Sequence, residues 1–157
     1  MIHLTASLTR DFVIGANGDQ PWYIPDDLAL FKQLTINHTV IMGWKTFNTP
    51  RLRQPLPDRH NIVLSHIPRD IPEVTVCLSI PEALEQAKQQ SSEIFVIGGT
   101  SVYEQFLPLA DWLHLSWVKK PYVGDVYFPR FKANDWVQVV EKNFDAFTYM
   151  EYKRKNA

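Results

Sequence analysis

The sequence predicts an α/β protein with a mostly parallel central sheet and helices on both of its faces. Short apolar runs rich in Val, Ile and Leu recur along the chain, as is typical of buried strands. Segments with helical periodicity lie between several of these runs, and strands that alternate with helices favour a parallel sheet. We expect strands at residues 1–8, 39–43, 60–65, 74–78, 93–99 and 112–118, and helices at residues 25–37, 44–48, 80–90 and 100–109.

The C-terminal region is expected to add antiparallel strands to this sheet. Residues 136–142 and 146–154 both have the composition of strands. The connection between them, NFDA at residues 143–146, is a weak turn signal. We nevertheless predict that the two segments pair as a hairpin at one edge of the sheet.

Composition limits the classes of protein to which the chain can belong. The 157 residues suit one domain, residues 1–157, and a hydrophobic content of 45% is enough for its core. The formal net charge of −1 lacks the basic excess of a general nucleic-acid binder, so no nucleic-acid partner is expected. No apolar run approaches the ~20 residues needed to cross a membrane, and no signal peptide is visible.

Cysteine and histidine usage favours a protein of a reducing compartment without a metal. Cys77 is the one cysteine of the sequence, so no disulfide can form within the chain. Disulfides are characteristic of oxidising compartments, and a cytoplasmic location is therefore expected. The five histidines show no spacing typical of a metal site.

Ligands of open α/β sheets bind beyond the carboxyl ends of the strands, near a point where the strand order reverses. This rule directs attention to four places in the sequence. They are the loop before Asp27, the residues from Gly43 onward, Ser65, and the pair Gly98-Gly99. The functional residues are expected at these places.

Two adjacent aspartates begin the first predicted helix, and helical geometry separates their roles. Pro25 suits a helix start, because the N–H that it lacks would have no partner there. At 100° per residue, Asp27 falls close to the centre of an apolar face, whereas Asp26 falls near its edge. Asp26 is interpreted as a solvated acid that complements the helix dipole. The apolar face comprises Leu28, Leu30, Phe31 and Leu34.

Asp27 needs a further explanation, because an unpaired carboxylate among apolar side chains is costly. Three interpretations remain open. The side chain caps a frayed first turn, forms a buried salt bridge, or points into a cavity where a ligand supplies donors. In a cavity it would bind a flat amidine-like group through paired hydrogen bonds. Apolar walls would also raise its pKa towards the range that is useful for proton transfer.

Two turns between a strand and a helix have the form of phosphate-binding turns. The first is Gly98-Gly99, before a helix predicted at Thr100, and the second is IMGWKTF, with Lys45 and Thr46. Free N–H groups at a helix start bind phosphate, and glycines let the backbone approach it. A Gly-Gly turn is as often only a tight turn. Two such turns fit a dinucleotide better than a single phosphate.

Three arginines, Arg51, Arg53 and Arg59, lie in or just after a Pro-rich loop. They form either a solvated rim or a fork for a substrate carboxylate, and spacing alone does not distinguish these interpretations. The loop is too short to link two domains, so we interpret it as a rigid rim of one domain.

Seven motifs occur in order along the chain. They are VIG at 13–15, PW at 21–22, PDDLALFK at 25–32, VIMGWKTF at 40–47, PLPDRHNIVLS at 55–65, VIGGTSVYEQFLP at 96–108 and GDVYFP at 124–129. In this order and spacing the chain resembles the dihydrofolate reductase family of the bacterial monomeric type, from Ile2 almost to the C-terminus.

The resemblance implies a fold and an activity. The fold would have a mostly parallel sheet of about eight strands. The activity would be the NADPH-dependent reduction of dihydrofolate to tetrahydrofolate, which supports one-carbon metabolism. Such an enzyme binds dihydrofolate and antifolate inhibitors such as trimethoprim, and it is expected to be a cytoplasmic monomer.

The resemblance also assigns roles to residues. Asp27 matches the active-site acid that anchors the pterin and promotes protonation of the ring nitrogen beside the hydride acceptor. Trp22 would hold an ordered water beside the pterin, Ser116 would bond to the acid, and Arg59 would bind the α-carboxylate of the substrate. Further substrate-binding residues would be Ala6, Ser7, Leu28, Phe31, Leu56, Ile97 and Tyr103. The cofactor would be bound by Ile14, Gln20, Gly43, Lys45, Thr46, Ser65, Gly98 and Gly99.

Several cofactor positions depart from the family pattern. Gln20 stands where the family usually has a large apolar residue, in the loop that closes over the nicotinamide. Trp44 and Ser101 replace common arginines, which leaves strict preference for NADPH over NADH in question. Lys45 or His66 would compensate for the lost charge, or Trp44 would stack on the adenine.

The rim of the substrate site also differs from the family pattern. Ser7 is atypical at the pterin edge, and the loop at residues 48–59 lacks the usual Gly and is about two residues longer. We therefore predict altered sensitivity to diaminopyrimidine antifolates such as trimethoprim.

Two other functions share part of this pattern. A reductase of the riboflavin pathway has the same fold and a similar Gly-Gly turn but acts on a phosphorylated pyrimidine. It should lack the Asp27–Phe31 segment after Pro21-Trp22. A non-catalytic nucleotide-binding relative should lack Asp27 or the Gly-Gly turn. Both features are present, so reduction of dihydrofolate remains the prediction.

Overall fold

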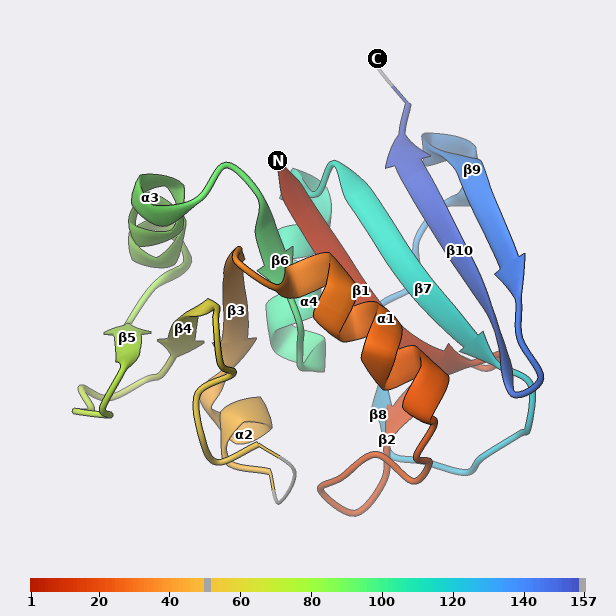
Figure 1. Ribbon diagram of the computed structural model, residues 1–157, viewed down its shortest axis with the longest axis horizontal. Coiled ribbons are helices and arrows are strands. Elements are labelled where there is room, and N and C mark those ends of the chain that lie inside the picture. The colour runs from red at the N-terminus through yellow and green to blue at the C-terminus, as the bar shows by residue number, and fades with distance from the viewer. Residues whose placement is uncertain (50–51, 156–157) are drawn as a thin grey trace.

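An eight-stranded sheet forms the centre of the protein, in the order β5-β4-β3-β6-β1-β7-β10-β9 (Figure 1). The structure, a computed structural model, describes residues 1–49 and 52–155. Pairing is parallel from β5 to β7, and β10 and β9 add antiparallel pairs at one edge. The strands are β1 (Ile2–Thr9), β3 (Thr39–Gly43), β4 (His60–Leu64), β5 (Val74–Cys77), β6 (Ile94–Val96), β7 (Trp112–Val118), β9 (Trp136–Asn143) and β10 (Phe147–Arg154).

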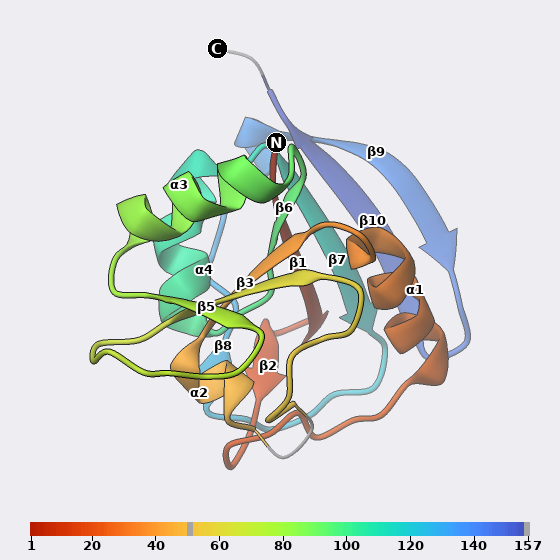
Figure 2. The same ribbon diagram turned by 60° about the vertical axis from the view of Figure 1, so that its left-hand side comes forward.

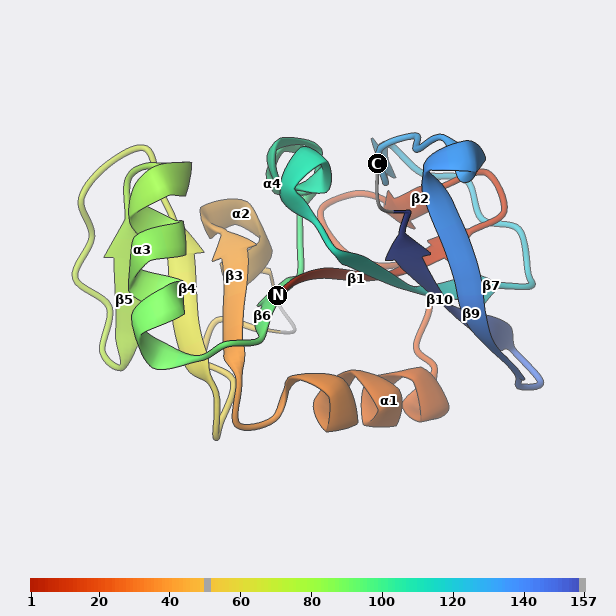
Figure 3. The same cartoon turned by 90° about the horizontal axis from the view of Figure 1, so that it is seen from above.

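Helices cover both faces of the sheet, which confirms the predicted α/β class. Figure 3 shows α1 on one side of the sheet and α4 on the other. α3 packs against β4 and β5, at the end of the sheet that Figure 2 brings forward. No helix within residues 1–49 and 52–155 is both long and apolar enough to cross a membrane. The helices are α1 (Pro25–Thr35), α2 (Trp44–Phe47), α3 (Ile80–Gln90) and α4 (Thr100–Phe106), with 3₁₀ turns η1 (Leu107–Leu109) and η2 (Ala133–Asp135).

Three helices end earlier than predicted, and α2 does so by one residue, at Phe47. α1 ends at Thr35, because Asn37 adopts a left-handed conformation with a φ of 64°, which asparagine tolerates at helix ends. α4 ends at Phe106 and continues only as the 3₁₀ turn η1. Pro108 lies in that turn and lacks the N–H that an α-helix would need there.

The predicted C-terminal hairpin forms despite its weak turn signal. Phe144 N donates to Phe147 O at 2.9 Å and closes the turn between β9 and β10. The two phenyl rings stack, with centroids 4.5 Å apart. Aromatic stacking therefore supports a turn that has neither Gly nor Pro.

Strand alternation aims polar side chains of the central strands at α1. In β1, Leu4 and Leu8 are fully buried in the larger hydrophobic core. Ser7 points to the opposite face, because successive side chains of a strand alternate. Ser7 of β1 lies directly beside Ser116 of β7 in the parallel register. Two hydroxyls are thereby placed side by side beneath the helix.

A second sheet of two very short strands was not predicted. β2 (Val13–Gly15) pairs antiparallel with β8 (Val126–Tyr127). Such short runs carry no readable alternation. A Cβ atom at Gly124 would lie 2.4 Å from Gly15 O, so this close approach of two segments requires glycine. The pairing fixes the start of the loop at residues 16–24 that leads to α1.

Candidate functional site

One cavity of about 1320 Å³ brings together almost all of the predicted site residues. It extends from α1 past the ends of the central strands to the turns after β3, β4 and β6. The predicted substrate-binding residues that line it are Ala6, Ser7, Leu28, Phe31, Leu56, Arg59, Ile97 and Tyr103. The predicted cofactor-binding residues that line it are Ile14, Gln20, Gly43, Lys45, Thr46, Ser65, Gly98 and Gly99. Asp27 and Ser116 line it as well.

The apolar face of α1 lines this cavity. Its four residues, Leu28, Leu30, Phe31 and Leu34, all contribute to the cavity wall, and Leu28 is 45% exposed. Sequence periodicity identified the face correctly, although much of it borders open space rather than the packed core. Periodicity does not distinguish these two cases, because both require apolar side chains on one side of a helix.

Asp27 points into the cavity, which favours the third of the three interpretations. The N-cap of α1 is Ile24, and no side chain caps that end of the helix. Among the described residues, no Lys, Arg or His forms an ion pair with Asp27. Asp26, in contrast, is exposed, as its position at the edge of the face suggested.

Two opposing influences act on the carboxylate of Asp27. Burial in the apolar cavity disfavours the charged form and raises the pKa above its ordinary value. Hydrogen bonds from the hydroxyls of Ser116 and Ser7 stabilise the charged form and partly offset that shift. Ser116 Oγ donates to Asp27 Oδ1 at 2.5 Å. The net effect is an acid with a raised pKa at the wall of the cavity.

Trp22 lies behind Ser7 and does not line the cavity. Its side chain is 4% exposed, and Nε1 donates to Ser7 Oγ at 2.9 Å. Ser7 therefore bridges the indole and the carboxylate of Asp27. Ser7 is atypical in the sequence, but the bridge that it forms was not predicted.

Arg59 is held in a defined orientation at the cavity wall. Its Nε donates to Pro57 O at 2.9 Å, and Nη1 donates to Thr35 Oγ1 at 3.0 Å. The guanidinium carbon lies 6.0 Å from the centroid of the Phe31 ring. Of the other two candidate arginines, Arg53 is exposed and outside the cavity, and Arg51 lies outside the described residues.

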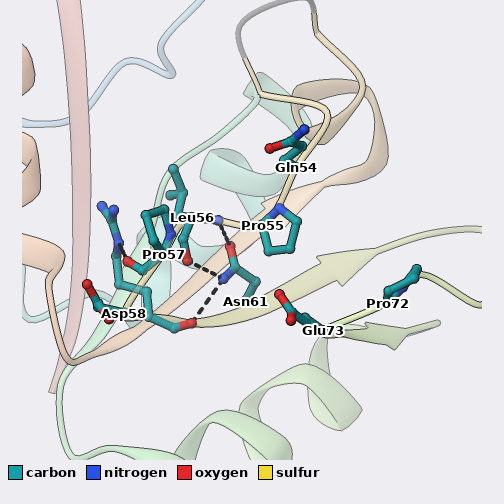
Figure 4. Close-up of a pocket in the computed structure, with 9 residues that line it drawn as sticks. Gln54, Pro55, Leu56, Pro57, Asp58, Asn61, Pro72 and Glu73 are labelled. Carbon is teal, nitrogen blue, oxygen red and sulfur yellow. Dashed lines mark hydrogen bonds between the residues drawn. The ribbon is translucent and has the colours of Figure 1, made fainter.

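The loop that carries Arg59 is fixed by a residue that the sequence analysis missed. Asn61 is 1% exposed, and its Oδ1 accepts from Leu56 N at 2.9 Å. Its Nδ2 donates to Leu56 O at 2.9 Å and to Arg59 O at 3.0 Å. Figure 4 shows these bonds at a separate small pocket of about 370 Å³. A single amide thereby positions two residues of the large cavity.

The glycine turns leave room for a ligand that approaches the backbone closely. Gly43 N donates to Gly98 O at 2.9 Å, so the turns after β3 and β6 meet. Gly98 has a φ of 125°, which favours glycine. A Cβ atom at Gly43 would lie 3.2 Å from Val102 Cγ2. Thr46 and Ser65 also line the cavity. The Ser65 hydroxyl donates to Ile67 O at 2.7 Å, so Lys45 and Thr46 are the side-chain donors here that fit the phosphates of a dinucleotide.

Arg69 is a further cavity residue that the sequence analysis missed. Its guanidinium carbon lies 3.7 Å from the centroid of the Trp44 ring, and its Nε donates to Ser65 Oγ at 2.9 Å. The residue lies in the loop between β4 and β5, and it lines the cavity. The available sequence signal was only its place four residues after Ser65.

A chain of titratable side chains crosses the sheet beside the cavity. His3 Nδ1 lies 2.9 Å from His114 Nε2, and His114 Nδ1 lies 3.0 Å from the hydroxyl of Tyr149. Glu93 and Glu151 are hydrogen-bonded at the two ends of this chain. Burial, and then the neighbouring His3, lower the pKa of His114 to about 4.

Comparisons with known proteins agree with this geometry. The family model for dihydrofolate reductase matches residues 1–155. A dihydrofolate reductase from Haloferax volcanii is 36% identical over 160 residues, which cover 97% of this chain and 82% of the relative. One from Bacillus subtilis (strain 168) is 34% identical over 165 residues, which cover 100% of this chain and 96% of the relative. A solved structure, dihydrofolate reductase from Enterococcus faecalis complexed with NADP(H) and RAB-propyl, is similar with a TM-score of 0.91 and 30% identity, covering 99% of this chain and 97% of that one.

Proposed function

The chain belongs to the dihydrofolate reductase family, and from this premise we propose how its own residues perform the reaction. It reduces dihydrofolate to tetrahydrofolate with NADPH. The predicted fold, activity and cofactor are thereby confirmed. The roles of individual residues below are proposals.

Asp27 anchors the pterin of the substrate. Its ionised carboxylate accepts hydrogen bonds from the amino group and a ring N–H of the pterin, an amidine-like pair that matches two carboxylate oxygens. Ser116 occupies one side of Oδ1 and sets the orientation of the carboxylate. The negative charge promotes protonation of the ring nitrogen next to the carbon that is reduced, and water can deliver that proton.

Arg59 binds the opposite, acidic end of the substrate. Two of its nitrogens are fixed by Pro57 and Thr35, so the guanidinium is already oriented before a carboxylate arrives. Leu28 and Phe31 of α1 provide an apolar wall between Arg59 and Asp27. The substrate is thus held by the Asp27 carboxylate at one end of an apolar slot and by the Arg59 guanidinium at the other.

The two glycine turns and their neighbours hold the cofactor. NADPH supplies the hydride for the reduction when it is bound. The backbone at Gly43 and Gly98 allows close approach, and the side chains of Lys45 and Thr46 donate to phosphates. Ser65 lines the same cavity and accepts a hydrogen bond from Arg69 Nε. Ile14 and Gln20 line the cavity near the small β2–β8 sheet. The chain positions the two reactants and excludes water, and no residue of its own is oxidised or reduced.

Further properties belong to the same proposal. The atypical rim residues Ser7 and Gln20 line the cavity, which supports altered sensitivity to diaminopyrimidine antifolates. Inhibition constants equal to those of typical bacterial enzymes would contradict it. A single domain, a monomeric state and a cytoplasmic location are also proposed, the last because Cys77 is the one cysteine.

The observation that carries this proposal is the hydrogen-bonded Asp27 on the apolar cavity wall, in one cavity with the glycine turns. The test is to incubate the purified chain with dihydrofolate and NADPH and to quantify both products. We expect one tetrahydrofolate for each NADPH oxidised, with no oxidation when dihydrofolate is omitted. NADPH oxidation that does not depend on dihydrofolate would contradict the assignment.

A further inference from the structure

Arg69 is fixed against two other cavity residues. Its guanidinium lies over the ring of Trp44 at 3.7 Å, a favourable distance for a cation–π contact. Its Nε donates to Ser65 Oγ at 2.9 Å, and Ser65 Oγ donates to Ile67 O at 2.7 Å. A long side chain that would otherwise be mobile is therefore held in one plane.

The guanidinium of Arg69 lies at the end of the cavity far from Asp27. Asp27 is bonded to Ser116 of β7, whereas Ser65 follows β4. Four strand spacings of about 4.8 Å separate β7 from β4, or about 19 Å along the sheet. With the pterin at Asp27 and the glycine turns between them, the far end is where the adenosine half of the cofactor belongs.

The free donors of Arg69 suit a phosphate at that end. Arginine has five N–H donors, and one of them is used by Ser65, so the two terminal nitrogens remain for a ligand. Among residues 1–49 and 52–155, no Asp or Glu forms an ion pair with Arg69. A planar fork with unused donors recognises phosphate in a bidentate manner.

NADPH and NADH differ by one phosphate on the adenosine ribose, and a nearby arginine is a general way to accommodate it. We propose that Arg69 is the residue by which this chain selects the phosphorylated cofactor, and that Trp44 is its positioning residue. The inference rests on the proposed function and adds a specificity determinant to it. Arg69 covers one face of the Trp44 ring, so stacking of Trp44 on adenine would use the opposite face.

The direct test is a binding measurement that requires no turnover. Adenosine 2′,5′-bisphosphate carries the extra phosphate and 5′-AMP lacks it, so calorimetric titration with both separates phosphate recognition from adenosine binding. For Arg69→Gln we expect the affinity for the bisphosphate to fall by about tenfold or more, with affinity for 5′-AMP unchanged within twofold. Trp44→Leu should give a smaller loss of the same kind, because the arginine stays but loses its support.

Arg130 offers a matched control. Its guanidinium also lies over an aromatic ring, Phe12, at 4.1 Å, but it is exposed and does not line the cavity. Arg130→Gln should bind both nucleotides as the wild type does. Arg69→Lys keeps the charge without the fork and should bind the bisphosphate with intermediate affinity. It also provides a second variant if Arg69→Gln folds poorly.

Three results would overturn the proposal. They are an unchanged affinity of Arg69→Gln for the bisphosphate, an equal loss for both nucleotides, and a larger loss in Lys45→Gln than in Arg69→Gln. Kinetics give a second readout, because kcat/KM with NADPH should fall in Arg69→Gln by a similar factor while kcat/KM with NADH is retained. Failure of the wild type to reduce dihydrofolate would contradict the proposed function instead, and it would leave the nucleotide titration as a valid test of Arg69.

Discussion

Replacing Asn61 should destabilise the loop that carries Leu56 and Arg59. The buried amide of Asn61 satisfies three backbone groups, namely Leu56 N, Leu56 O and Arg59 O, at 2.9, 2.9 and 3.0 Å (Figure 4). Asn61→Ala removes all three bonds at once, so these three backbone groups lose their partner. Asn61→Asp keeps the acceptor for Leu56 N but places an anion against two carbonyl oxygens.

The size of the effect follows from these three bonds. A hydrogen bond contributes about 1 kcal/mol net, and an unsatisfied buried group costs somewhat more. Asn61→Ala should therefore lower the free energy of unfolding by about 3 kcal/mol, or the Tm by about 6–12 °C for a domain of this size. Asn61→Asp should be at least as destabilising, because its carboxylate cannot donate.

Urea unfolding and ligand binding together test this reasoning. The affinity for dihydrofolate should fall several-fold in Asn61→Ala, because Leu56 and Arg59 lose their fixed positions, whereas the affinity for NADPH should change little. Gln54→Ala, which alters an exposed amide in the same pocket, should change stability by less than about 0.5 kcal/mol. A loss below about 1 kcal/mol in Asn61→Ala, or equal losses for both ligands, would refute the argument.

Three further predictions concern the acid, the glycine turn and the histidine pair. Ser116→Ala removes a hydrogen bond that stabilises ionised Asp27, so the apparent pKa in the pH profile of kcat/KM should move upwards; a downward move or none would contradict this. Gly98→Ala puts a side chain at a φ of 125° beside Tyr103, and unfolding experiments should show a loss of about 1–3 kcal/mol together with weaker NADPH binding. His114 has a pKa of about 4 in the folded chain against an ordinary 6.5, so the unfolded state binds more protons between these values and wild-type stability should fall as the pH falls from 6.5 to 4. In His114→Phe the slope of stability against pH should decrease by about one proton, and an unchanged slope would rule out this origin of acid sensitivity.

The sequence predicted the features of the fold that depend on regular patterns. The apolar runs predicted six of the eight main strands, and strand-like composition predicted the two of the C-terminal hairpin. The periodicity of α1 placed Asp27 on an apolar face and Asp26 at its edge. Periodicity did not reveal that the face of α1 lines a cavity, because packed and cavity-lining faces have the same composition. The sheet formed by β2 and β8 was missed, since its strands are too short to alternate.

The missed site residues share a physical reason. Asn61 and Arg69 act through contacts with loops and with a ring on another element, and neither lies in a pattern with a local period. Their partners become visible only when the strands β3, β4 and β5 are placed side by side. Ser7 was noticed as atypical, but its bridge from Trp22 to Asp27 depends on the register between β1 and β7.

The central claim is that Asp27, and not its neighbour Asp26, is the acid on which the reduction of dihydrofolate depends. The most direct measurement compares kcat/KM for dihydrofolate near neutral pH in the wild type, Asp27→Asn and Asp26→Asn, at saturating NADPH. The account predicts a loss of about 10²-fold or more in Asp27→Asn, as for a lost proton-transfer group, and a change of less than about twofold in Asp26→Asn. A wild-type rate in Asp27→Asn, or an equal loss in both variants, would contradict it.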